Sequence, residues 1–263
     1  MFRLQSDRYT LHSHTEYCDG RAPMAEMVAA AVAAGMTDYG FTPHSPIPLD
    51  SPCNMAFGDV RPYINEYNRL KAEYDGKINL WLGMEIDYLD GAWGPDEEYF
   101  DSLGLDYRIG SVHFLKSKDG FIDVDGSAER FRQSLADHFD NDLAGVVNLF
   151  YDTTERMIRA GHFDIIGHFD KIAANASAID PEITHKDWYK ERVNSIIDLI
   201  SEAGMTAEIN TKSLVDRGRF FPDEEYWPRL LELGIPLLVN SDAHYPDRVD
   251  ANRAVALAKL ATK

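Results

Sequence analysis

The sequence predicts a single α/β domain, built as a parallel barrel of seven strands with helices around it. Short apolar runs rich in β-branched or aromatic residues alternate with amphipathic stretches that end in glycine, and about seven such units fit into the 263 residues. The chain has no internal repeat, low-complexity tract or Pro/Ser/Gly-rich linker. We therefore expect the domain to span residues 1–263.

Each expected strand is a short apolar run bounded by turn-forming residues. The runs at 8–14 and 38–42 come first, and the longer run at 78–88 contains a single glutamate near its end. The seven expected strands are 8–14, 38–42, 78–88, 107–114, 163–169, 205–210 and 235–240.

The expected helices lie between these runs. An alanine-rich stretch follows Pro23 and stops at Gly35, the proline start and glycine stop typical of a helix. Thr184 and Asp187 resemble a capping box that opens a helix ending at Gly204. The expected helical segments are 24–34, 59–75, 127–160, 184–204 and 223–233.

The composition excludes several classes of protein. With 44% hydrophobic and 11% aromatic residues the chain is too apolar for disorder, and no stretch approaches the ~18 uncharged apolar residues of a membrane helix. The N-terminus has no apolar signal region, and Cys18 and Cys53 form no paired motif, so we expect a cytoplasmic protein. The formal charge of −18 repels phosphate backbones and argues against a nucleic-acid partner.

Residues that commonly bind metals gather at the C-terminal ends of the expected strands. Six of the nine histidines, one glutamate and one aspartate follow this rule. In barrels the loops at these ends build the active site, so the side chains are expected to converge on one rim. They are His12, His14, His44, Glu85, His113, His168, Asp242 and His244.

The spacing within this set favours a shared metal site. His12 and His14 are two positions apart on a strand and therefore point to the same face. Asp242 and His244 repeat the arrangement at the last strand, which barrel closure places beside the first. Glu85 lies within an apolar strand, where a buried carboxylate requires a cationic partner such as a metal ion.

Taken together, the motifs resemble those of the polymerase and histidinol phosphatase (PHP) family, most closely its stand-alone histidinol-phosphate phosphatases. Their order and spacing match over nearly the whole chain. The motifs are His12-Ser13-His14 followed by Asp19, Phe41-Thr42-Pro43-His44, Gly83-Met84-Glu85-Ile86-Asp87, Gly110-Ser111-Val112-His113-Phe114, Gly167-His168-Phe169-Asp170 and Ser241-Asp242-Ala243-His244.

The resemblance implies a distorted seven-stranded, TIM-like (β/α) barrel that holds three divalent ions. Because His, Asp and Glu ligands accept zinc, iron and manganese alike, the metals themselves stay open. Many relatives carry histidine near the position of Asp19. An oxygen ligand is a harder donor than an imidazole nitrogen, so Asp19 would shift the third site toward harder metal ions. The implied ligands are His12, His14, Glu85 and Asp242 for the first ion, Glu85, His113 and His168 for the second, and Asp19, His44 and His244 for the third.

The resemblance further implies a metal-dependent phosphomonoesterase. Its substrate would be a small-molecule phosphate ester, expected to be L-histidinol phosphate of histidine biosynthesis, and inorganic phosphate would be a product. The expected catalytic residues are Glu85, Asp19, Asp242 and His244. Two alternatives stay open, namely a nucleotide-directed phosphoesterase or 3′-exonuclease of the same family, and a non-catalytic metal-binding module.

Residues expected to contact the substrate are chosen from those that follow the strand ends. Lys171 and Arg217 each lie a few residues past a strand, where a cation would hold phosphate. Glu208 and Asn210 alternate on the sixth strand, which supplies no expected metal ligand, and are assigned to the organic part of the substrate.

Overall fold

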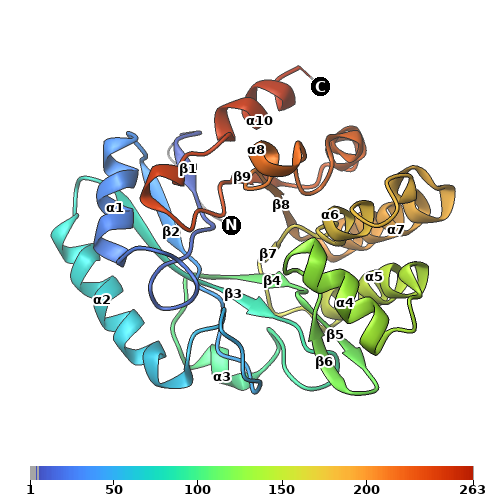
Figure 1. Ribbon diagram of the computed structural model, residues 1–263. Coiled ribbons are helices and arrows are strands. Elements are labelled where there is room, and N and C mark those ends of the chain that lie inside the picture. Colours follow the sequence, from blue (N-terminus) through green and yellow to red (C-terminus); the bar gives the residue numbers. More distant parts are fainter. Residues whose placement is uncertain (1–3, 5, 263) are drawn as a thin grey trace.

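The computed structural model describes residue 4 and residues 6–262, so residues 1–3, 5 and 263 of the expected domain lie outside it. Seven parallel strands form one curved sheet in the order β1-β2-β3-β4-β7-β8-β9, which confirms the predicted barrel (Figure 1). The strands are β1 (Tyr9–Thr10), β2 (Asp38–Phe41), β3 (Asn79–Asp87), β4 (Tyr107–Ser111), β7 (Ile165–Ile166), β8 (Thr206–Asn210) and β9 (Leu237–Asn240).

The first and last strands meet along a short seam. Ser13 and Ala243 form an isolated parallel bridge, and the His14 amide donates to the Ala243 carbonyl at 2.9 Å. Below this bridge, the Leu11 amide donates to Asn240 Oδ1 at 2.8 Å. The barrel is therefore closed by a few bonds that lie beside two of the expected metal-binding motifs.

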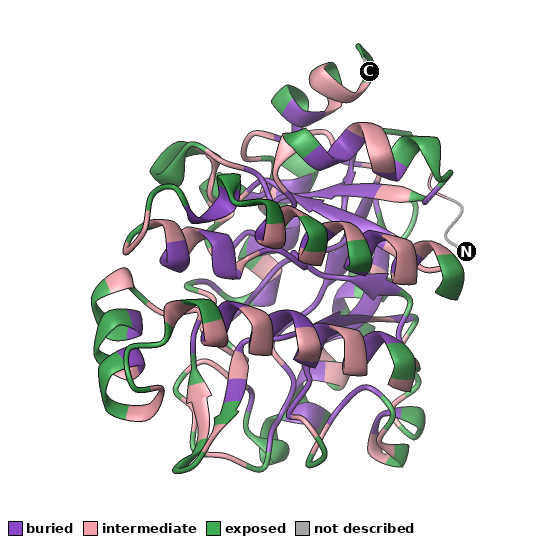
Figure 2. Ribbon diagram, turned by 90° about the vertical axis from the view of Figure 1, so that its right-hand side faces the viewer, coloured by how far each residue is buried: buried purple, intermediate pink, exposed green. Residues whose placement is uncertain are grey.

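Helices cover the outside of the barrel, with their buried faces toward the strands and their exposed faces toward solvent (Figure 2). None of the helices in the described part of the chain is long and apolar enough to cross a membrane. The α-helices are α1 (Met24–Ala33), α2 (Val60–Glu73), α3 (Glu98–Asp101), α4 (Ala128–His138), α5 (Leu143–Ala160), α6 (Ile172–Ser177), α7 (Asp187–Ala203), α8 (Leu214–Arg217), α9 (Trp227–Glu232) and α10 (Arg253–Leu260), and short 3-10 turns are η1 (Phe57–Asp59), η2 (Ile183–His185), η3 (Glu224–Tyr226) and η4 (Pro246–Arg248).

Alternation along the strands separates the helix layer from the barrel interior. Ala207 and Ile209 pack in the cluster formed with the surrounding helices, so Glu208 between them faces inward. Met84 and Ile86 likewise pack outward around Glu85. A separate apolar cluster fills the lower interior and consists of Tyr9, Leu11, Tyr107, Ile109, Ile165 and Leu238.

Two expected elements differ in the structure. The helix predicted at 127–160 is divided into α4 and α5, because Asp140 (φ 51°) and Asn141 (φ 59°) adopt the left-handed conformation. The helix predicted to open at Thr184 starts later, because Thr184 lies in the 3-10 turn η2 and Lys186 precedes the first residue of α7.

Several elements went unpredicted. An antiparallel hairpin of β5 (Phe114–Ser117) and β6 (Gly120–Asp123) follows β4, and the short helices α3, α6, α8 and α10 lie in stretches for which no helix or strand was predicted. In the first expected strand only Tyr9 and Thr10 pair with β2.

Tyr107 explains why two neighbouring strands, β2 and β3, each carry a glycine that faces the interior. Its ring crosses the interior from β4, and its hydroxyl donates to the Leu11 carbonyl at 2.8 Å. A Cβ at Gly83 would lie 2.6 Å from Cζ of Tyr107, and a Cβ at Gly40 would overlap its hydroxyl oxygen. Glycine at these positions leaves the space that the ring fills.

We expect Gly40→Ala to lower the free energy of unfolding by about 1–3 kcal/mol, the usual cost of overpacking a well-filled interior. Gly58→Ala is the matched control, because nothing lies within 4 Å of a Cβ built there. Urea denaturation of the two variants measures the difference. Equal midpoints would show that the Tyr107 ring moves freely and does not require glycine.

Candidate metal centre

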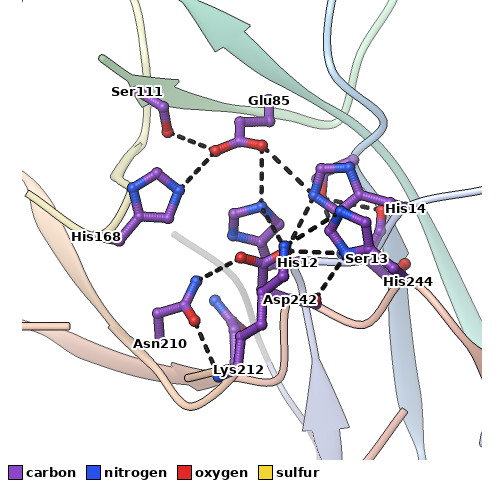
Figure 3. A network of polar contacts seen from close by, with 12 residues as sticks. His12, Ser13, His14, Glu85, Ser111, His168, Asn210, Lys212, Asp242 and His244 are labelled. Carbon is purple, nitrogen blue, oxygen red and sulfur yellow. Dashed lines mark hydrogen bonds and ion pairs between the residues drawn. The ribbon is translucent and has the colours of Figure 1, made fainter. Parts of the chain in front are cut away.

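All nine expected metal ligands come together above the barrel interior. Figure 3 labels His12, His14, Glu85, His168, Asp242 and His244 among them. Each lies in or just after a barrel strand, except Asp19, which returns to the site on the loop after β1. A Cβ at Gly20 would overlap the backbone of Thr15, so glycine allows this loop to fold back tightly. Donor atoms lie within 4.8 Å of one another in four overlapping groups, which are His14, Asp19, His44 and His244; His12, Glu85 and His168; His12, His14 and Asp242; and His44, Glu85 and His113.

Glu85 lies at the centre of the cluster and faces ligands on both of its oxygens. Oε2 is 3.2 Å from Nε2 of His12 and 3.1 Å from Nδ1 of His44. Oε1 is 2.9 Å from Nε2 of His168 and accepts a hydrogen bond from Oγ of Ser111 at 2.7 Å. This two-sided arrangement is what a bridging carboxylate requires.

Asp242 and Asp19 supply the other carboxylates. Oδ1 of Asp242 is 3.1 Å from Nε2 of His14 and 3.4 Å from Nδ1 of His244. The Asp242 backbone has φ of 49°, a conformation that costs energy for a residue other than glycine and is often found at functional sites. Oδ1 of Asp19 is 3.2 Å from Nε2 of His244 and 3.8 Å from Nε2 of His44.

The cluster fits divalent metal ions, because its inward-facing atoms are buried without hydrogen bonds. Buried polar atoms are normally paired, so several such atoms facing one another indicate cations between them. The atoms are Nε2 of His12, His14 and His113, Nδ1 of His44, Oε2 of Glu85 and Oδ1 of Asp19.

The electrostatics of the cluster keep its carboxylates anionic. Burial raises the pKa of Glu85, but the facing His12, His44 and His113 outweigh it and hold that pKa well below its usual range. Burial also raises the pKa of Asp242, yet Lys212 and His12 hold it well below the ordinary value. Ionised carboxylates and imidazole nitrogens are the donors that zinc, iron and manganese share.

Hydrogen bonds on the far side of two histidines fix their orientation. Nδ1 of His12 donates to Oε1 of Glu208 at 2.7 Å, and Nδ1 of His113 donates to Oδ1 of Asp87 at 2.6 Å. Asn54 holds Asp87 in turn through a 2.7 Å bond to Oδ2. Each carboxylate directs the opposite ring nitrogen, Nε2, at the centre of the cluster.

The structure does not place Glu208 and Asn210 on the substrate rim expected from the sequence. Both side chains are buried, and Glu208 accepts bonds from Asn240 at 3.0 Å and Asn210 at 3.2 Å besides that from His12. Asn210 also donates to Oδ2 of Asp242 at 3.0 Å. The inward-facing positions of this strand point below the metal centre rather than over it.

Of the two residues expected to bind phosphate, only one lines the cavity above the cluster. Lys171 lines the cavity above the cluster, whereas Arg217 is exposed on α8 and donates to Asn175 at 3.3 Å. Lys212 lies where Arg217 was expected, with Nζ 3.4 Å from Oδ1 of Asp242 and 3.2 Å from Nε2 of His244. Its position two residues after β8 is the signal that would have identified it.

A cavity of about 190 Å³ opens above the cluster. This volume lies below the ~300 Å³ at which drug-sized ligand pockets begin, so it suits a small molecule. Metal ligands form its floor. The other lining residues are Cys53, Asn54, Asp87, Phe114, Asp123, Asp125, Gly126, Lys171 and Lys212.

Comparison with known proteins agrees with this geometry. Residues 10–212 match the model of the PHP domain family. A protein of Deinococcus radiodurans named as a probable histidinol-phosphatase is 28% identical over 256 residues, which cover 95% of this chain and 91% of the relative.

Two solved structures share the fold. A Listeria monocytogenes protein assigned as a histidinol phosphatase has a TM-score of 0.85 at 21% identity, covering 94% of this chain and 99% of that one. The histidinol phosphate phosphatase of Lactococcus lactis, solved with zinc, L-histidinol and phosphate, has a TM-score of 0.70 at 18% identity, covering 97% and 92%.

We expect Glu208→Ala to weaken metal binding by about 10- to 100-fold, because His12 loses the acceptor that orients it. Isothermal titration of the metal-free protein with zinc measures the affinity. Glu208→Gln, which retains an acceptor oxygen, should recover part of it, and Glu202→Ala, at an exposed glutamate of α7, is the matched control. Unchanged zinc affinity in Glu208→Ala would remove this role from Glu208.

Proposed function

The chain belongs to the PHP domain family, and we propose that it hydrolyses L-histidinol phosphate to L-histidinol and inorganic phosphate. The observation that carries the proposal is a set of nine metal-ligand side chains, buried or partly buried, beneath a small cavity with two lysines in its wall. The relative from Deinococcus radiodurans, similar over nearly the full length of both chains, supports this choice of substrate.

We assign three divalent ions to the cluster. His12, His14, Glu85 and Asp242 would hold the first; Glu85, His113 and His168 the second; and Asp19, His44 and His244 the third. Three donor groups in the structure resemble this division, since they unite His12 and His14 with Asp242, Glu85 with His113, and Asp19 with His44 and His244. The groups also overlap, because His14 lies in the group of Asp19, His12 in that of His168 and His44 in that of His113. When bound, such ions supply positive charge for phosphoryl oxygens and make water nucleophilic at neutral pH.

The chain's own residues bind and orient the ester. Lys171 and Lys212 contribute ammonium groups from the segments that follow two neighbouring strands, β7 and β8, and both line the cavity. Charge-assisted hydrogen bonds from such groups to phosphoryl oxygens are about twice as strong as neutral ones. Glu208 and Asp87 act beneath the floor, where they keep the His12 and His113 rings directed at the cluster.

We expect the purified protein to carry more than one transition-metal ion per chain. Nine convergent ligands exceed the four that one tetrahedral ion uses. Glu85→Gln should lower both metal content and phosphatase rate, because it removes the central charge from two donor groups. Elemental analysis measures the metal content, with Glu129→Gln on the surface of α4 as the control. An active protein with one ion or none would refute the multinuclear centre.

We expect kcat/KM for L-histidinol phosphate to exceed that for 4-nitrophenyl phosphate by more than tenfold, which corresponds to about 1.4 kcal/mol of transition-state binding. Lys171→Ala and Lys212→Ala should each slow both reactions, since both lysines bind the phosphoryl group that the substrates share. Arg217→Ala, outside the cavity, should leave both rates within twofold. Equal rates of the wild-type protein on the two esters would remove histidinol phosphate as the substrate.

A further inference from the structure

One ion pair in the cavity wall has no part in holding the metal ligands. Nζ of Lys171 lies 2.8 Å from Oδ2 of Asp125, and both side chains line the cavity. Lys171 follows β7, whereas Asp125 lies in the segment between the β5–β6 hairpin and α4. The pair therefore joins two separate elements at the entrance to the metal centre.

Asp125 is the carboxylate of this wall that already binds an ammonium group, that of Lys171. Oδ1 of Asp123 accepts the backbone amides of Asp125 and Gly126 at 2.8 and 3.2 Å, and so shapes the turn. Asp87 is bonded to His113 and Asn54. The Asp125 side chain is 31% exposed and faces Lys171, a partner that belongs to a flexible side chain.

Each member of the pair stabilises the charge of the other. Burial raises the pKa of Asp125, but the neighbouring Lys171 outweighs it and lowers that pKa below its usual range. As long as Lys171 stays beside Asp125, the negative charge of Asp125 is compensated. Moving Lys171 to a phosphoryl oxygen would leave a partly buried carboxylate without a partner, which is unfavourable.

We propose that Asp125 selects phosphate esters that carry an ammonium group close to the ester oxygen. This inference rests on the proposed function and concerns its specificity. The substrate ammonium replaces Lys171 on Asp125, and Lys171 turns to the phosphoryl oxygens. One ion pair within the protein becomes two pairs with the substrate, and no charge in the wall is left unpaired.

L-Histidinol phosphate matches this exchange, because its amine is on the carbon next to the CH2–O–P group. When an ester without the amine binds, Lys171 can reach its phosphoryl oxygens only by leaving the Asp125 carboxylate without a cationic partner. The exchange thereby makes recognition of the amine and recognition of the phosphate depend on each other.

A second cavity beside the cluster is a less suitable place for the ammonium. It shares Lys212 and Asp242 with the first and is otherwise lined by residues of the loops after β8 and β9. Besides Asp242 its carboxylates are Asp216 and Asp247, and both residues are exposed, Asp247 with a side chain that is 80% exposed, so water solvates them and weakens their attraction for a cation. Asp247→Asn therefore serves to test this alternative.

The experiment compares L-histidinol phosphate with 3-(imidazol-4-yl)propyl phosphate, which differs only by the absence of the amine. We expect Asp125→Asn to lower kcat/KM for L-histidinol phosphate by at least tenfold and to raise it at least twofold for the amine-free ester, because Lys171 is released. Asp119→Asn, in the hairpin turn of the same region, has the same change of charge and should leave both values unchanged.

Equal losses on both esters in Asp125→Asn would indicate a merely structural role and overturn the proposal, as would unchanged values. Selective loss of the amine preference in Asp247→Asn would transfer the ammonium site to the second cavity. A wild-type protein that hydrolyses neither ester would refute the proposed function instead.

Calorimetric titration with L-histidinol tests Asp125 without catalysis, and Lys171→Met provides a second variant. We expect Asp125→Asn to weaken L-histidinol binding at least tenfold, whereas Lys171→Met should tighten it several-fold, because the ammonium then meets no competitor. Unchanged L-histidinol affinity in both variants would overturn the exchange.

Discussion

The ionised carboxylate of Glu85, buried at the centre of a protein barrel, is the constraint on which the rest of the structure depends. Its side chain is 1% exposed, and a charge in such a place is tolerated only if cations and hydrogen bonds surround it. Histidines from four different strand ends and the hydroxyl of Ser111 meet this requirement. The closed, parallel arrangement of strands brings these groups together at one end of the barrel.

The interior below the centre is organised in layers that follow from alternation along the strands. Tyr107 and its apolar neighbours fill the lowest layer, and Glu208, held by Asn210 and Asn240, forms a polar layer above them. The metal-ligand atoms lie above both. Each layer limits how far the side chains of the layer above it can move. The positions of the metal-ligand atoms therefore depend on packing and hydrogen bonds that lie beneath the cluster.

The sequence was sufficient to predict the barrel and to choose residues that the structure brings into one cluster, because both depend on strand ends, which short apolar runs mark clearly. It was insufficient where the direction of a side chain matters. Glu208 faces inward below the centre, and Lys212 rather than Arg217 reaches the cavity. The break between α4 and α5 depends on the left-handed backbone at Asp140 and Asn141, in a region whose amphipathic pattern continues across it.

The seam of the barrel has a consequence for the order in which the molecule is assembled during translation. Thr10 and Ser241, whose hydroxyl oxygens are 3.2 Å apart at this seam, are 231 positions apart in the sequence. Contacts with such separation form late, since a long loop must close first. A nascent chain therefore exposes His12 and His14 without Asp242 until residue 242 has been synthesised. During that interval the growing chain offers an incomplete set of ligand side chains, and the full set comes together only when the first and last strands of the barrel meet.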